Sequence, residues 1–166
     1  MLFHVSEDPG IELFMPRPSL IVAEPVVWAI DEAHLRNYLL PRDCPRVTYA
    51  AGPRTTAAEA AQFLTNNRPV VAIESIWFER ARVTPLHCYS LPADSFELQD
   101  TIAGYFVSRR PVRPERVELI PNPLERLRSV GVELRVLSNL WALHDAVAAS
   151  TLEFSMIRMR LAQPRV

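Results

Sequence analysis

The pattern of hydrophobic and polar positions divides the chain into short strands and short helices. Alternation, or a brief apolar run between turn residues, predicts strands, and these segments are 1–6, 25–31, 46–50, 70–74, 85–91, 101–108, 116–120, 133–138 and 154–162. Capping residues beside helix-forming runs predict helices, and these segments are 32–40, 55–67, 75–82, 124–131 and 140–150. Residues 11–24 are predicted to be irregular, because Pro16 and Pro18 exclude a helix there.

Strands and helices alternate only loosely along the chain, whereas a doubly wound parallel sheet requires regular alternation. We therefore predict a mixed α+β fold with short helices around the sheet, in a single domain spanning residues 1–166. A chain of 166 residues with 49% hydrophobic composition is long enough to bury one packed core. The 15 prolines are spread between the elements, and no repeat or linker divides the chain.

The basic residues of this chain are all arginine. Eighteen are present and lysine is absent, which excludes a phosphate-binding loop ending in Gly-Lys-Ser/Thr and a lysine Schiff base. The four glycines lie far apart, which excludes a GxGxxG dinucleotide fingerprint. Arginine remains for binding phosphate or carboxylate through its bidentate fork. The net charge of −1 gives no electrostatic reason to bind nucleic acid or an anionic membrane.

Targeting and metal-binding signals are weak throughout. Polar residues begin at His4, so we expect no signal peptide, and no apolar run reaches the roughly 18 residues of a membrane helix. Cys44 and Cys88 form no CxxC pair, and no HxxxH or HExxH spacing occurs, so we expect no metal site. A cytoplasmic protein with reduced thiols and no membrane partner is the expectation.

His4 and Ser6 are two residues apart on the first predicted strand, so their side chains share one face. This pair predicts either a ligand-facing surface or a solvated face that hydrogen-bonds to the following turn. Two aromatic residues come next in the chain, Trp28 on the second strand and Tyr38 on the following helix. Each is predicted either to belong to the core or to contact a ligand.

The segment PRDCPRV, residues 41–47, places two guanidiniums, a carboxylate and a thiol in one proline-bounded connection. Nearby arginines favour the thiolate form of Cys44, but no histidine is near in sequence to act as its base, so a buried cysteine is the simpler interpretation. Asp43 either forms a structural ion pair or orients Arg42 and Arg46 for binding an anion. Later in the chain, Tyr105 and Arg109 lie in an arginine-rich stretch that predicts either a solvated turn or a phosphate-binding edge.

Several stretches, HVSEDP and PRDCPRV above all, resemble a bacterial family of unknown function, and the resemblance covers essentially the whole chain. The first strand, with an aromatic-His-x-Ser pattern, also resembles the start of ADP-ribosyltransferases and RNA 2′-phosphotransferases. This second resemblance implies a split or bent sheet, and a first-strand histidine, here His4, that contacts the NAD ribose or a phosphate-bearing substrate. Transferases of that group place a glutamate just before a late strand, whereas here Glu97 lies well before that strand and Glu118 lies beyond it.

We therefore expect a cleft that binds a nucleotide or another small phosphorylated ligand, with NAD as a candidate cofactor. His4 is the candidate catalytic residue, and the candidate ligand-binding residues are Ser6, Trp28, Tyr38, Arg42, Asp43, Arg46, Tyr105 and Arg109. Transfer of an ADP-ribosyl or phosphate group is the expected reaction. Among nucleic acids, only a 2′-phosphorylated RNA end is an expected partner. The alternatives are a non-catalytic nucleotide-sensing or protein-interaction module of the same fold, and a hydrolase acting on an unrelated anionic substrate.

Overall fold

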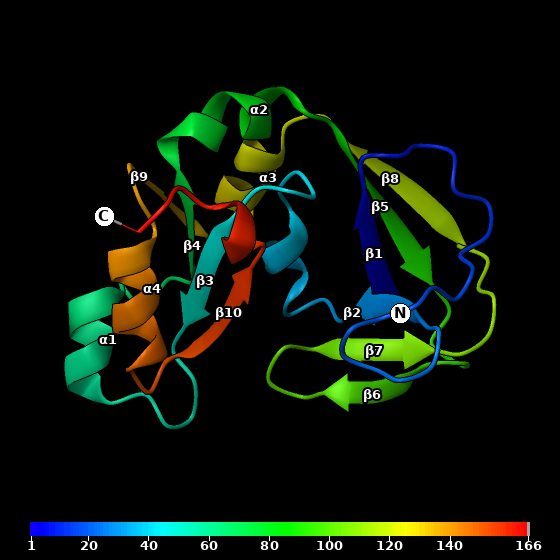
Figure 1. Ribbon diagram of the computed structural model, residues 1–166, viewed down its shortest axis with the longest axis horizontal. Coiled ribbons are helices and arrows are strands. Elements are labelled where there is room, and N and C mark those ends of the chain that lie inside the picture. The colour runs from blue at the N-terminus through cyan, green and yellow to red at the C-terminus, as the bar shows by residue number, and fades with distance from the viewer. Residues whose placement is uncertain (166) are drawn as a thin grey trace.

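A computed structural model describes residues 1–165 and shows two sheets with four α-helices among them (Figure 1). The larger sheet has the strand order β6-β7-β2-β1-β5-β8 and is antiparallel throughout. Its strands are β1 (Leu2–Ser6), β2 (Val27–Ile30), β5 (Leu86–Leu91), β6 (Glu97–Asp100), β7 (Tyr105–Ser108) and β8 (Arg116–Ile120). The mixed α+β class is thus confirmed.

The smaller sheet has the order β10-β3-β4-β9, and only its β4–β9 pair is parallel. Its strands are β3 (Arg46–Ala50), β4 (Val70–Glu74), β9 (Glu133–Leu137) and β10 (Glu153–Ile157). The strands thus form two separate sheets, a division that the sequence pattern did not assign to particular strands. The reason is that β3 and β4 pair with strands from the C-terminal third of the chain, and a local hydrophobic pattern does not specify such partners.

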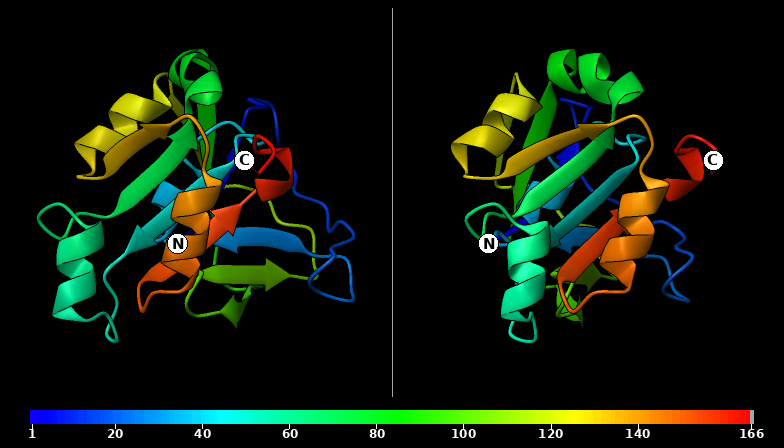
Figure 2. Two further views of the ribbon diagram at one scale, coloured as in Figure 1. Left: turned by 60° about the vertical axis from the view of Figure 1, so that its left-hand side comes forward. Right: turned by 90° about the vertical axis from the view of Figure 1, so that its left-hand side faces the viewer.

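The helices cover both faces of the smaller sheet (Figure 2). They are α1 (Ala57–Phe63), α2 (Phe78–Val83), α3 (Pro123–Ser129) and α4 (Trp141–Ala148), with short 3₁₀ turns η1 (Leu35–Tyr38), η2 (Ser75–Trp77) and η3 (Met159–Leu161). Helices α1 and α4 pack on one face around Val47 and Val70. On the other face, α2 and α3 join the core between the sheets, where Ile73 and Leu86 are buried. No helix within residues 1–165 has both the length and the apolar surface to cross a bilayer.

Several predicted elements are shorter in the structure than the sequence pattern indicates, among them the helix expected at 55–67, which is Ala57–Phe63. The helix expected at 32–40 is only the 3₁₀ turn Leu35–Tyr38, because Pro41 has no N–H to donate to the carbonyl of Asn37. The strand expected at 101–108 begins at Tyr105, since Gly104 has a φ of 68° and forms a turn. The strand expected at 154–162 ends at Ile157 and is followed by a residue in the left-handed conformation.

Candidate functional site

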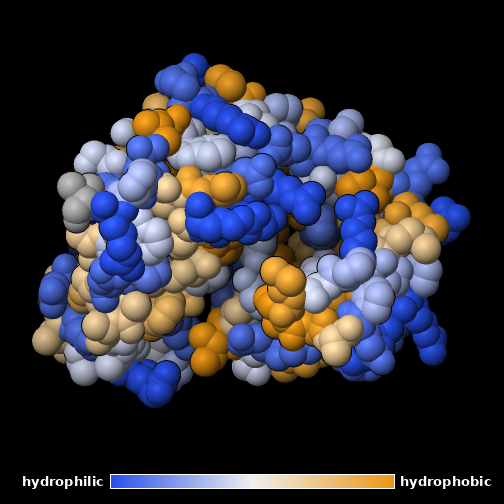
Figure 3. Space-filling view, viewed as in Figure 1, coloured by the Kyte–Doolittle hydropathy of each residue, from blue (hydrophilic) through white to orange (hydrophobic). Residues whose placement is uncertain are grey.

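The larger sheet opens between its two central strands. β1 pairs with β5 at five positions, Leu2 to Ser6, but with β2 at a single position, Phe3 opposite Ile30. Beyond that pair the strands run in different directions, so the sheet is bent between β1 and β2 (Figure 1). The molecular surface is hollowed in the middle of the same view, between the two sheets (Figure 3).

His4 lies at this opening, on β1. Its Nδ1 is 2.9 Å from the carbonyl oxygen of Trp28 on β2, and its ring packs against Phe14 with 4.8 Å between centroids. A carbonyl can only accept, so Nδ1 carries the hydrogen, and in the neutral ring Nε2 keeps a lone pair. The opening therefore holds an imidazole of fixed tautomer with one acceptor nitrogen.

The surroundings of His4 keep its ring neutral. Burial lowers the pKa of His4, and the positive charges of Arg42 and Arg17 lower it further, against the opposing effect of the hydrogen bond to Trp28. The charged side chains that act on its pKa are thus both arginines. A histidine in this setting accepts a hydrogen bond at neutral pH and does not carry a positive charge of its own.

Arg17 and Arg42 are the exposed arginines whose charges act on the pKa of His4. Neither guanidinium has a hydrogen-bond or ion-pair partner within residues 1–165, although the backbone of each is held. Arg17 is fixed by a two-way backbone bridge to Val26, and the Arg42 N–H donates to Glu7 Oε1 at 2.9 Å. Two arginine forks with free donors beside a neutral histidine form a positive site suited to an anion.

Arg46 occupies a different position from Arg42. It is 1% exposed, and its guanidinium donates to the carbonyl oxygens of Cys44 at 2.9 Å, Asn37 at 3.2 Å and Pro41 at 2.6 Å. Burial lowers its pKa to about 10, so it remains charged at neutral pH. Arg46 therefore holds the PRDCPRV segment in shape from within, and its donors are engaged with the backbone.

The other polar residues of this segment are not arranged as an acid or a nucleophile. Asp43 is exposed, and its ion pair is with Arg158, at 3.9 Å from Nε, and not with Arg42 or Arg46. Cys44 is fully buried, and burial raises the pKa of its thiol to about 11. Cys44 therefore fills the core between the sheets, as the absence of a nearby base indicated.

The structure brings three of the predicted aromatic residues together. Trp28 and Tyr105 meet edge to face with 5.7 Å between ring centroids, and Tyr105 meets Tyr38 in the same way at 6.2 Å. The two tyrosine hydroxyls are 2.6 Å apart. Burial and the neighbouring Tyr105 raise the pKa of Tyr38, so the Tyr38 hydroxyl is protonated at neutral pH. The partly exposed Trp28 offers a surface for an aromatic ligand.

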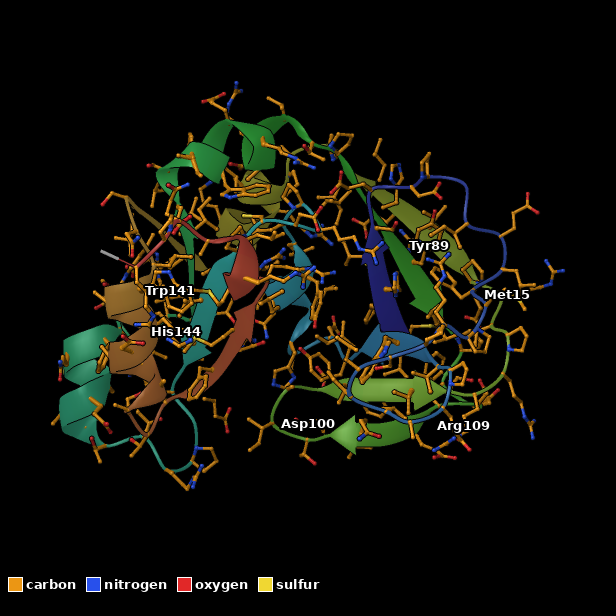
Figure 4. All side chains as sticks on the ribbon, viewed as in Figure 1. Met15, Tyr89, Asp100, Arg109, Trp141 and His144 are labelled. Atoms are coloured by element: carbon orange, nitrogen blue, oxygen red, sulfur yellow. The ribbon has the colours of Figure 1, made fainter. Side chains whose placement is uncertain are left out.

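Ser6 and Arg109 are not brought to this group. The Ser6 hydroxyl accepts a hydrogen bond from the Asp8 N–H at 3.1 Å, within the turn after β1. Arg109 follows β7, at the opposite end of that strand from Tyr105 (Figure 4). Its guanidinium is paired with Glu24 and, at 2.7 Å, with Glu97. Two carboxylates thus already occupy the fork that was expected to bind phosphate.

Two arginines at the site were not identified from the sequence. Arg17 stands between Pro16 and Pro18, and this proline bracketing is the same local signal that drew attention to residues 41–47. Arg158 follows β10 and donates from Nε to the carbonyl oxygen of Arg42 at 3.2 Å. Nothing in the local sequence marks Arg158, because its position depends on the pairing of β10 with β3.

The family of unknown function DUF6886 matches residues 3–162 of this chain. No curated protein and no solved structure matches this chain.

Proposed function

The chain belongs to DUF6886, a family of unknown function, and we propose that it binds a nucleotide or another phosphorylated small molecule where β1 and β2 separate. The observation that carries the proposal is His4, with Nδ1 committed to the Trp28 carbonyl and Nε2 left as an acceptor beside Arg17 and Arg42. An acceptor nitrogen suits a ribose hydroxyl, and arginine forks suit the attached phosphate. The Trp28 ring projects to the opposite face of β2 from Val27 and Ala29, which pack with the Phe14 that His4 contacts, so we assign it no part in holding this ligand.

The arrangement also supports an ADP-ribosyltransferase-like assignment, which we make part of the proposal. A histidine-bearing first strand and a sheet bent between β1 and β2 agree with the split sheet expected of such proteins. In this assignment, His4 orients a ribose or phosphate, and the arginines stabilise negative charge on a transferred phosphate or ADP-ribosyl group. NAD is the candidate co-substrate for ADP-ribosyl transfer.

A second candidate function is a non-catalytic nucleotide-sensing module. The observation that favours it is the lack of a carboxylate among the charges that act on the pKa of His4, within residues 1–165. Glu97, the last glutamate before β7, is exposed and paired with Arg109. A site of this kind retains binding through histidine and arginine while lacking a carboxylate to activate a ribose hydroxyl.

Thermal melting with added ligand tests the binding proposal. NAD, ADP-ribose and adenosine 2′-phosphate are each titrated, and a ligand present at about 100 times its dissociation constant raises the unfolding free energy by roughly 2.7 kcal/mol. The shift should fall in His4→Ala and persist in Arg109→Ala, whose side chain lies at the other end of β7. No shift with any of the three ligands, or a shift unaffected by His4→Ala, would overturn the proposal.

Product analysis then separates the two candidates. Incubation with NAD alone, and with NAD together with a 2′-phosphorylated oligonucleotide, is followed by measurement of released nicotinamide and of the dephosphorylated oligonucleotide, with NAD supplying the ADP-ribose that accepts the phosphate. Turnover that disappears in His4→Ala supports the transferase. Tight binding without turnover of either substrate supports the sensing module.

A further inference from the structure

Arg158 adopts a backbone conformation that is unusual for its residue type. Its φ and ψ are 57° and 25°, in the left-handed region, where the Cβ of a non-glycine residue comes too close to the backbone. The other non-glycine residues with positive φ within residues 1–165 are Asn66 and Asn67, and asparagine tolerates this region far better. Strain of this kind persists where the surrounding structure imposes it, and it is concentrated at ligand sites.

The strained residue lies over the PRDCPRV segment. Strand β10 pairs with β3 up to Ile157, which stands opposite the buried Arg46. The left-handed turn at the next residue brings Nε of Arg158 to 3.2 Å from the carbonyl oxygen of Arg42. Arg158 is therefore hydrogen-bonded to the backbone of Arg42, and the Arg42 guanidinium itself has no partner within residues 1–165.

Positive charge accumulates at this point with little compensation. Arg46 has carbonyl partners and no carboxylate within residues 1–165. The acidic groups nearby are Asp43, which is exposed and 3.9 Å from Nε of Arg158, and Glu7, which accepts the Arg42 N–H. The charges of Arg46 and Arg158 repel one another, and an anion bound by the free guanidiniums of Arg158 and Arg42 would relieve this repulsion.

The terminal nitrogens of Arg158, like the side chain of Arg42, have no partner within residues 1–165. Two free forks match a phosphomonoester, which has three terminal oxygens and a charge of about −1.5 to −2 at pH 7. Each phosphate of the pyrophosphate in a dinucleotide such as NAD has one ester and one anhydride linkage, with a single charge and fewer free oxygens. The donor set therefore fits a terminal phosphate better than a bridging one.

We infer that Arg158 and Arg42 together bind the terminal phosphate of a phosphomonoester, so that the site accepts a mononucleotide-like ligand in preference to a dinucleotide. The inference rests on the proposed function, because it assigns the phosphate end of a ligand whose ribose is held at His4. Strained Arg158 is thus a specificity-determining residue contributed by the smaller sheet.

Calorimetric titration with four probes tests the inference: adenosine, adenosine 2′-phosphate, adenosine 5′-phosphate and NAD. Wild type should bind one of the monophosphates at least roughly tenfold more tightly than adenosine or NAD. Two variants remove the Arg158 guanidinium: Arg158→Gly, which permits the left-handed backbone, and Arg158→Gln. Each should weaken the binding of that monophosphate by about 10- to 100-fold, the effect of losing charge-assisted hydrogen bonds. Both variants should bind adenosine with the same affinity as wild type. Arg160→Gln, an exposed arginine two residues further on, is the matched control.

The pH dependence supplies an independent readout. Monophosphate affinity in wild type should rise between about pH 5 and pH 7, as the second phosphate proton with a pKa near 6 is lost, and this rise should flatten in Arg158→Gly. Binding of adenosine or NAD that depends on His4, with no gain from a terminal phosphate, would overturn the role of Arg158 and leave the proposed function standing. Failure of all four probes to bind wild type would overturn both.

Discussion

The Nδ1 atom of His4 on β1 donates a hydrogen bond to the carbonyl oxygen of Trp28 on β2, 2.9 Å away, at the place where these two strands cease to pair. In a continuous antiparallel pair, a backbone N–H would satisfy that carbonyl. A side chain replaces the backbone here, so the bend of the sheet and the tautomer of the histidine are set by the same contact.

His4 should make the protein less stable in mild acid. Its pKa in the folded state is below the ordinary 6.5, chiefly because of burial, so the unfolded chain binds the proton more readily. The unfolding free energy should therefore fall as the pH is lowered through the ordinary pKa towards the folded one. Urea unfolding of wild type and His4→Gln, from about pH 7.5 to about pH 5, should show a steeper loss in wild type. Parallel curves would show that protonation of His4 is not coupled to folding.

Removal of Arg46 should destabilise the fold strongly. Arg46→Ala leaves the carbonyls of Cys44 and Asn37 without the donor that Arg46 supplies, and each such loss costs about 1–3 kcal/mol. The Pro41 carbonyl loses one of two donors and keeps the Cys44 N–H. We expect a fall of roughly 3 kcal/mol or more in the unfolding free energy, measured by urea denaturation. The matched change Arg109→Ala removes only exposed ion pairs and should cost about 1 kcal/mol or less. Equal effects would contradict the internal role of Arg46.

Both thiols should be unreactive in the folded protein. Cys44 and Cys88 are buried, and burial raises the pKa of each to about 11, so the nucleophilic thiolate is scarce at pH 8. Iodoacetamide followed by mass spectrometry should label neither residue in native buffer and both in denaturant. Rapid labelling of Cys44 alone in native buffer would contradict this prediction and would show that the PRDCPRV segment contains a reactive thiol.

Two glycines with positive φ should respond differently to alanine. A Cβ at Gly104 would fall on Nδ1 of His34 and within 2.7 Å of Asp31 Oδ2, whereas a Cβ at Gly131 meets nothing within 4 Å. Gly131→Ala carries only the backbone strain, about 1–2 kcal/mol. Gly104→Ala should cost roughly 2 kcal/mol more, because Asp31 and His34 are held together by their own hydrogen bond. Thermal or urea unfolding measures the difference, and similar losses would indicate that this pair moves aside easily.

The part of the site that was predictable is the part encoded in local chemistry. His4 at the end of a short strand and the proline-bounded segment around Arg42 and Cys44 are visible in the sequence. The separate roles of Arg42 and Arg46 are not visible in the sequence, because both are arginines that flank the same cysteine. Burial alone distinguishes them: one is exposed, and the other is enclosed by backbone carbonyls.

By itself, the sequence determined most of the short strands, the mixed α+β class and the exclusion of lysine-dependent chemistry. These follow from residue identity and from periodicities a few residues long. The tertiary structure alone decided that β3 and β4 form a second sheet with β9 and β10. It also decided that Arg158 turns back over the PRDCPRV segment. Both depend on contacts between segments about 60 to 115 residues apart, and such pairings are selected by the packing of the whole core.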